Sequence, residues 1–167
     1  MIVSNSTPLI HLVRIGQLEL LNRLFKKVLI PKTVFDEVVV KGEEQGYLDA
    51  KVIRKATGEW MEIRELNEGE LKELENILKI GPLGKGEGES ITLAKSAKLP
   101  LLIDDLLGQK IAKIFAIETY WTTSIILKAF TKGLITKSEA KEIIEDLINS
   151  GLRIKSEVVV ELMKILS

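Results

Sequence analysis

Short aliphatic runs alternate with helical segments along the whole chain, and this alternation limits the fold more than any other feature. Each run is typical of a buried strand, and each is followed by a stretch with helical periodicity or capping residues. Strands separated by helices pair in parallel through right-handed crossovers. The sequence therefore predicts an α/β protein: a three-layer α/β/α domain around a parallel sheet of four or five strands. The expected strands are residues 1–4, 28–30, 60–66, 101–103 and 118–121.

Capping and breaking residues divide the segments between these strands. Asn67 with Glu70, and Thr136 with Glu139, have the spacing of a capping box at a helix start. Polar residues 42–46 are expected to break a helix, and the glycine-rich stretch 81–88 is expected to be a flexible loop before a helix at 89–98.

The chain is predicted to divide into two parts near residue 133. Residues 1–133 would form the core of the domain, and residues 134–167 a C-terminal helical arm that packs on the domain or on a partner. The apolar surface of that arm would favour a homodimer.

Composition narrows the chemistry. The chain has no cysteine and a single histidine, His11, which excludes disulfides and zinc sites built from several histidines or thiolates. A metal would have to be a hard cation held by oxygens, such as Mg²⁺ or Mn²⁺. The formal net charge is zero. The sequence begins with a strand-like run instead of a signal peptide and has no membrane-spanning stretch, so a cytoplasmic protein is expected.

Two adjacent carboxylates, Asp104 and Asp105, follow the aliphatic run at 101–103. Ligands of open α/β sheets bind at the carboxyl ends of the strands, where the strand order reverses. Adjacent residues in extended chain point to opposite sides. One of the two carboxylates can therefore act on a ligand directly while the other caps the following helix or acts through water.

Other segments supply companions for these acids. Polar residues follow the first strand, an acid lies on the helix after the second, and two acids precede the strand at 101–103. Residues two apart do not share a helix face, so only one of those last two is expected to bind directly, and Glu89 is preferred. Carboxylates converging on Mg²⁺ serve phosphoryl transfer or phosphodiester hydrolysis. The companions are Asn5, Ser6, Glu37, Glu87 and Glu89.

Five segments, in order, resemble an uncharacterised prokaryotic subgroup of PIN-domain proteins related to VapC-type toxins. The match runs over essentially the whole chain. It consists of Val3-Ser4-Asn5-Ser6-Thr7-Pro8-Leu9-Ile10, then Leu29-Ile30-Pro31 with Val34 to Val38, then Gly86-Glu87-Gly88-Glu89-Ser90-Ile91 with Leu93-Ala94, then Leu102-Ile103-Asp104-Asp105, and finally Trp121-Thr122-Thr123 with Lys128 and Gly133-Leu134-Ile135.

This resemblance implies a PIN fold and a ribonuclease that depends on Mg²⁺ or Mn²⁺, often a toxin held by a small antitoxin protein. Carried over by position, the acidic quartet is Asn5, Glu37, Glu89 and Asp105, with Asp104 beside it. Ser6 or Thr7 falls where the family has a supporting hydroxyl, and Thr122 is a further supporting residue.

Asn5 departs from the family pattern, because this position is usually aspartate. Asparagine offers a neutral carbonyl oxygen, which is still a ligand but carries no charge. This residue favours a second hypothesis, a catalytically impaired PIN-like module that binds RNA or protein. A third is a phosphatase or phosphoacceptor domain that uses Asp104 or Asp105.

Overall fold

A five-stranded, all-parallel sheet with the order β3-β2-β1-β4-β5 forms the centre of the computed structural model, which describes all 167 residues. The sequence prediction of an α/β fold with a four- or five-stranded parallel sheet is confirmed. The first strand is the middle one and pairs with both β2 and β4. The strands are β1 (Ile2–Ser4), β2 (Val28–Pro31), β3 (Met61–Arg64), β4 (Leu101–Leu102) and β5 (Thr119–Tyr120).

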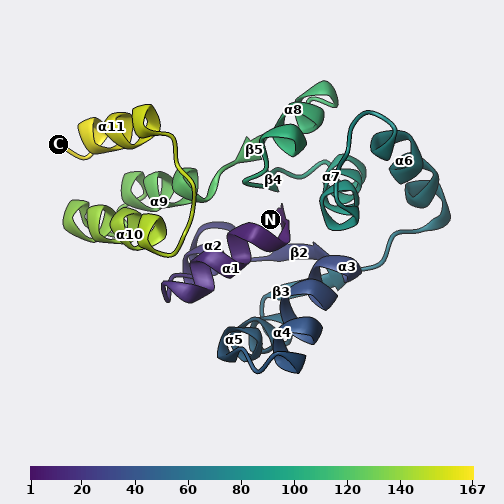
Figure 1. Cartoon of the computed structure of the whole chain (residues 1–167), viewed down its shortest axis with the longest axis horizontal. Helices are drawn as coiled ribbons and strands as arrows, with labels where there is room; N and C mark the ends of the chain where they lie inside the picture. The colour runs from purple at the N-terminus through teal and green to yellow at the C-terminus, as the bar shows by residue number, and fades with distance from the viewer.

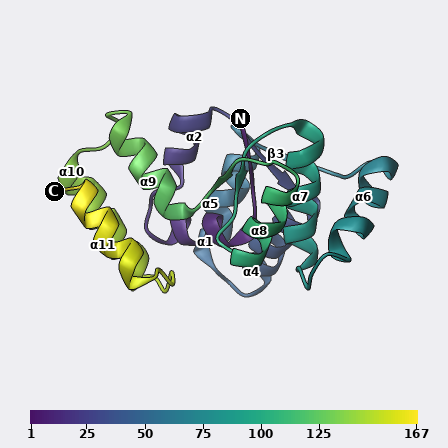
Figure 2. The same cartoon turned by 90° about the horizontal axis from the view of Figure 1, so that it is seen from above.

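Helices connect the strands and cover both faces of the sheet, with the last helices at one end of the molecule and α6 at the other (Figures 1 and 2). None of them combines the length and apolar character needed to cross a membrane. They are α1 (Ser6–Arg14), α2 (Glu19–Phe25), α3 (Lys32–Phe35), the π-helix η1 (Asp36–Val40), α4 (Lys41–Glu44), α5 (Leu48–Thr57), α6 (Glu68–Leu78), α7 (Lys85–Ala97), α8 (Leu106–Ile114), α9 (Thr122–Thr131), α10 (Lys137–Asn149) and α11 (Ser156–Ile165).

The core has two halves because successive strand residues point to opposite faces. On β1, Ile2 joins the apolar side chains of α1, α2, α9, α10 and α11, whereas Val3 joins those of α7 and α8. On β4, Leu101 lies with Val3, and Leu102 lies with Ile2. This alternation continues past the strand and sends Asp104 and Asp105 to different sides.

Of the C-terminal helices, α10 packs on α9, and both α10 and α11 share the core half of α1 and α2. The boundary predicted near residue 133 falls in the turn after α9, where Gly133 has a φ of +68°. His11 on α1 joins this region to the core, with its Nδ1 3.1 Å from the Ser150 hydroxyl at the end of α10. The arm is therefore fixed to the domain by buried apolar side chains and by a polar contact.

The prediction of a loop over residues 81–88 is wrong in its second half, because α7 begins at Lys85. Glu87 accepts a hydrogen bond of 2.9 Å from the Gly84 amide and so caps the helix start. At Gly88 an added methyl group would lie 2.8 Å from a methyl carbon of Leu78 on α6. The close packing of α6 on α7 therefore uses a glycine inside the helix and outweighs its low helix propensity.

The break predicted at 42–46 also begins too early, because α4 continues to Glu44. Gly42 is buried, and a methyl group added there would lie 2.9 Å from the Ala50 side chain. Close contact between α4 and α5 explains this glycine.

Both capping boxes are confirmed, at Asn67 before α6 and at Thr136 before α10.

Candidate active site

The carboxyl ends of β1 and β4 lie side by side and bring two of the predicted polar segments together. Ser4 is paired with Leu102, and the Asn5 amide donates a 3.0 Å hydrogen bond to the Leu102 carbonyl. The chain leaves β1 for α1 on one face of the sheet and leaves β4 for α8 on the other. The strand order thus reverses between β1 and β4, where α/β proteins place ligands.

Asn5 occupies the position before α1 but does not cap it. Its side chain is only 4% exposed, and it accepts no hydrogen bond from the first turn of the helix. Buried polar groups normally have a partner. The amide oxygen of Asn5 is therefore not committed to the helix start.

Glu37 reaches this edge of the sheet from η1. The Ser6 hydroxyl, at the start of α1, donates a hydrogen bond to its Oε2. The carboxylate also lies against the first turn of α7, since a methyl group added at Gly86 would be 3.2 Å from each of its oxygens. An anion is favoured near a helix N-terminus. Three segments that are far apart in the sequence thus meet at Glu37.

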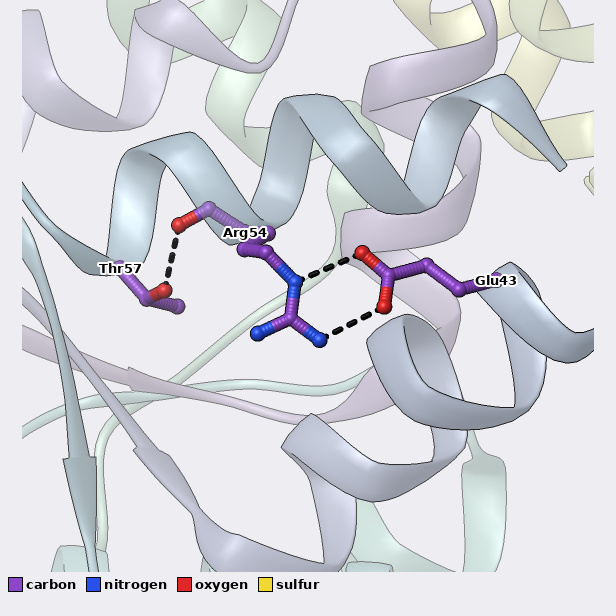
Figure 3. A network of polar contacts seen from close by, with 3 residues as sticks. All are labelled: Glu43, Arg54 and Thr57. Carbon is purple, nitrogen blue, oxygen red and sulfur yellow. Dashed lines mark hydrogen bonds and ion pairs between the residues drawn. The ribbon is translucent and has the colours of Figure 1, made fainter.

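The segments on either side of the π-helix that carries Glu37 are both in contact with α5. Arg54 on α5 makes two 2.6 Å hydrogen bonds to the Glu43 carboxylate on α4, as Figure 3 shows. The same guanidinium lies 5.5 Å from the centre of the Phe35 ring, just before η1. The hydrogen bond to Arg54 lowers the pKa of Glu43. Wide π turns are common at functional sites, and the run Val38 to Val40 that follows Glu37 is β-branched and poorly suited to an α-helix.

The two acids of α7 have separate environments. Glu89 is 7% exposed, and the nearest cation is Lys85, whose Nζ lies 3.7 Å from Oε1. Glu87 is committed to capping Gly84. Helix geometry therefore separates these acids as expected for residues two apart. The contact of Lys85 with Glu89 was not foreseen, although its i, i+4 spacing is a readable signal.

Asp104 and Asp105 also have different partners. Asp105 caps α8 through a 2.5 Å bond from the Gly108 amide to Oδ2, and no bond of this kind engages Oδ1. Asp104 accepts one bond on each oxygen from Thr122, 2.8 Å from the amide and 2.6 Å from the hydroxyl. Asp105 thus combines capping with a free oxygen, whereas both oxygens of Asp104 are occupied.

Burial raises the pKa of Asp104, and the hydrogen bonds from Thr122 and the nearby His11 oppose that rise. Burial also lowers the pKa of His11, against the attraction of Asp104. Thr122 therefore holds the Asp104 carboxylate in a buried position that disfavours its charged form. Thr122 is a predicted supporting residue, but its pairing with Asp104 could not be predicted because the two residues belong to different elements.

The structure therefore brings some of the predicted site residues into contact but does not gather all of them into one compact cluster. Ser6, Glu37 and the first turn of α7 are in contact, and Asn5 is joined to β4 through the backbone. No group of three acidic or histidine side chains is close enough to hold a metal ion as they stand. Thr7 is exposed and apart from these contacts.

Comparison with known proteins decides the family. A family model described as a PIN domain matches residues 1–167, the full length of the chain. The chain belongs to the PIN-domain family. PIN domains are generally nucleases, and they generally use divalent metal ions. Among curated proteins, none matches this PIN domain at a significant level.

The side chains at this edge of the PIN domain suit a hard divalent cation. All of them offer oxygen, which Mg²⁺ and Mn²⁺ prefer, and the chain has no thiolate that would favour zinc. Glu89 is buried with one lysine as its only cationic partner, and the buried Asn5 side chain does not cap a helix. The chemistry of these oxygen donors therefore fits a hard cation.

Proposed function

We propose that this PIN domain is a metal-dependent ribonuclease that hydrolyses phosphodiester bonds. The observation that supports it is the position of Glu37, which Ser6 and the first turn of α7 hold beside the ends of β1 and β4. Membership of the PIN-domain family, whose members are generally nucleases, supports the same proposal.

Each of these residues has a definite task in the proposal. Asp105, Glu89, Asn5 and Glu37 would hold the cation. When bound, Mg²⁺ or Mn²⁺ neutralises phosphate charge and lowers the pKa of an attacking water. Ser6 orients the Glu37 carboxylate, and Lys85 lies close enough to Glu89 to offset part of its charge.

Asp104 has a different task because Thr122 engages both of its oxygens. We assign it to positioning: its side chain ties the end of β4 to the start of α9 and so fixes the backbone that carries Asp105.

Labelled single-stranded RNA incubated with the purified protein tests the proposal. We expect cleavage that needs Mg²⁺ or Mn²⁺ and stops with a chelator. Asp105→Asn should lower the cleavage rate at least about 100-fold. Loss of a residue that orients a metal ligand already costs about 10- to 100-fold, and loss of the charged ligand itself should cost more.

Asn5→Asp is the informative companion to that experiment. Adding a carboxylate where the family usually has one should strengthen metal binding and raise the cleavage rate at low metal concentration. If neither the wild type nor Asn5→Asp cleaves RNA, and neither binds Mn²⁺, the nuclease proposal is wrong.

Variants of two neighbouring hydroxyl residues test whether Ser6 positions the Glu37 carboxylate or only lies near it. Ser6→Ala removes the donor to Glu37 and should reduce cleavage about 10-fold, the size typical of a residue that orients a metal ligand. Thr7→Ala, at an exposed hydroxyl one residue away, should change the rate less than about twofold. Equal rates for the two variants would show that Ser6 does not position Glu37.

A binding module without catalysis is the second candidate, and Asn5 together with the loose spacing of the acids favours it. Cleavage by Asn5→Asp but not by the wild type would support this reading.

A toxin role, a small antitoxin partner and a relation to VapC-type toxins stay predictions from the sequence resemblance. The homodimer also stays a prediction, favoured by exposed Val160 and Ile165 on α11.

A further inference from the structure

A cavity of about 360 Å³ lies where the C-terminal arm meets the end of β4. Asp104 and Leu106, which follows Asp105 directly, both line it. Residues 152–155, which join α10 to α11, also line it. The cavity therefore adjoins the candidate active site, yet none of the metal-holding residues proposed above lines it.

Large apolar side chains border this cavity and remain partly open to solvent. The exposed fraction is 50% for Leu106, 37% for Trp121 and 39% for Val158. Apolar groups left exposed around a hollow usually mark a ligand site. A partly exposed indole such as that of Trp121 can also stack on an unpaired base.

Two cations complete the wall. Arg153 and Lys155 alternate with Leu152 and Ile154 in a segment without helix or strand, and both basic side chains are exposed. The eight ion pairs of the chain involve neither of them. The only acid in the lining, Asp104, already accepts two hydrogen bonds from Thr122. The cavity thus presents positive charge beside apolar walls in a chain whose net charge is zero.

We propose that this cavity binds one nucleotide of a single-stranded RNA substrate, with the base against Trp121 and the adjoining phosphate on Arg153 and Lys155. The proposal rests on the proposed function for its choice of ligand. Unpaired cations next to an exposed aromatic ring match a nucleotide better than a peptide, which would need acidic and apolar side chains in the same small space.

The C-terminal arm would then hold the RNA strand beside the residues that cleave it. The volume of the cavity falls at the low end of the range for small-ligand pockets, which suits a single nucleotide and not a duplex. Because Leu106 adjoins Asp105 in the sequence, a nucleotide held there lies near the acid assigned to the metal.

Tryptophan fluorescence tests binding without any need for catalysis. The chain has two tryptophans, so Trp60→Phe leaves Trp121 as the only reporter. In the presence of a chelator, titration with a short unstructured RNA should quench Trp121 emission in a saturable way. A duplex of the same sequence should quench it far less, because its bases are already stacked.

Charge variants test the phosphate contact. Arg153→Gln with Lys155→Gln should weaken RNA binding about 10-fold at low salt, and should lower the slope of log affinity against log salt by about 1.4, the effect of two lost contacts to single-stranded nucleic acid. Lys72→Gln with Lys79→Gln is the matched control. These exposed lysines lie on and just after α6, at the opposite end of the molecule (Figure 2). The control pair should keep the wild-type slope.

The stacking contact has its own variant. Trp121→Leu keeps an apolar side chain but removes the ring, and should weaken RNA binding about 10-fold with little change in the salt slope. Its melting temperature, measured beside the wild type, shows whether the fold is intact.

Two outcomes would overturn the subsite. One is RNA binding with no effect on Trp121 and an unchanged salt slope in the Arg153 and Lys155 variant. The other is quenching of Trp121 by an acidic, apolar peptide when RNA has no effect. Because binding is measured without metal, absence of cleavage alone would count against the nuclease proposal and not against this subsite.

Discussion

Glu89→Gln is expected to reduce RNA cleavage at least about 100-fold and to abolish the rise in melting temperature that Mn²⁺ gives the wild type. Glu89 is 7% exposed, and its only cationic neighbour is Lys85 at 3.7 Å. Glutamine keeps the size of the side chain but removes the charge that would bind the ion. Without metal, the variant should be at least as stable as the wild type, since a buried charge is lost.

Glu87→Gln is the matched control because it neutralises an acid two residues away. Glu87 accepts the hydrogen bond from the Gly84 amide that caps α7. The weaker cap should lower the free energy of unfolding by up to about 1 kcal/mol, while cleavage stays within about twofold. Thermal unfolding with and without Mn²⁺, together with RNA cleavage, measures both variants. Equal loss of cleavage in both would mean that Glu89 has no special role.

Thr122→Val is expected to cause the largest loss of stability, about 2 kcal/mol at pH 7, which corresponds to a fall in melting temperature of about 6 °C. Thr122 is fully buried, and its hydroxyl donates a 2.6 Å hydrogen bond to Asp104. Valine fills the same space but leaves Oδ2 of a largely buried carboxylate without that donor. Thr122→Ser, which keeps the hydroxyl, should lose much less.

The effect of Thr122→Val should depend on pH in a defined direction. The pKa of Asp104 is raised above its ordinary value of 3.8, so its contribution to stability is greatest below that value and is lost as the pH rises through the folded-state pKa. The hydrogen bond from the Thr122 hydroxyl opposes that rise, so valine raises the pKa further. The difference from the wild type should therefore be largest at neutral pH and smaller near pH 4. A constant difference, measured by urea unfolding, would contradict the role assigned to this bond.

Local sequence signals predicted those parts of the molecule that local interactions decide. The capping boxes at Asn67 and Thr136 form as their spacing requires. Strand alternation correctly separates Asp104 from Asp105, because a side-chain period of two needs no tertiary information. The parallel direction of the strands could also be predicted, because strands joined through helices have little choice of direction.

Contacts between distant segments account for what could not be predicted. Gly86 and Gly88 suggested a loop by composition, but they lie in a helix because Glu37 and Leu78 pack against them. The bond between Asp104 and Thr122 joins β4 to the start of α9, and no periodicity relates the two. The cavity beside Trp121 depends on how the C-terminal arm packs, which a capping signal alone does not determine.

The central place of β1 has a consequence for how the protein is made. Its residue Val3 pairs with Leu29 soon after synthesis begins, but its other neighbour, Leu101, exists only when the ribosome has passed β4. Pairing of strands so far apart in sequence is a slow step in folding. A nascent chain that ends before that point carries Asn5, Ser6 and Glu37, yet has neither Asp105 nor the strand beside which they are held. Any nuclease activity of this protein therefore arises late in synthesis, and fragments that lack β4 are expected to be inert towards the RNA around them.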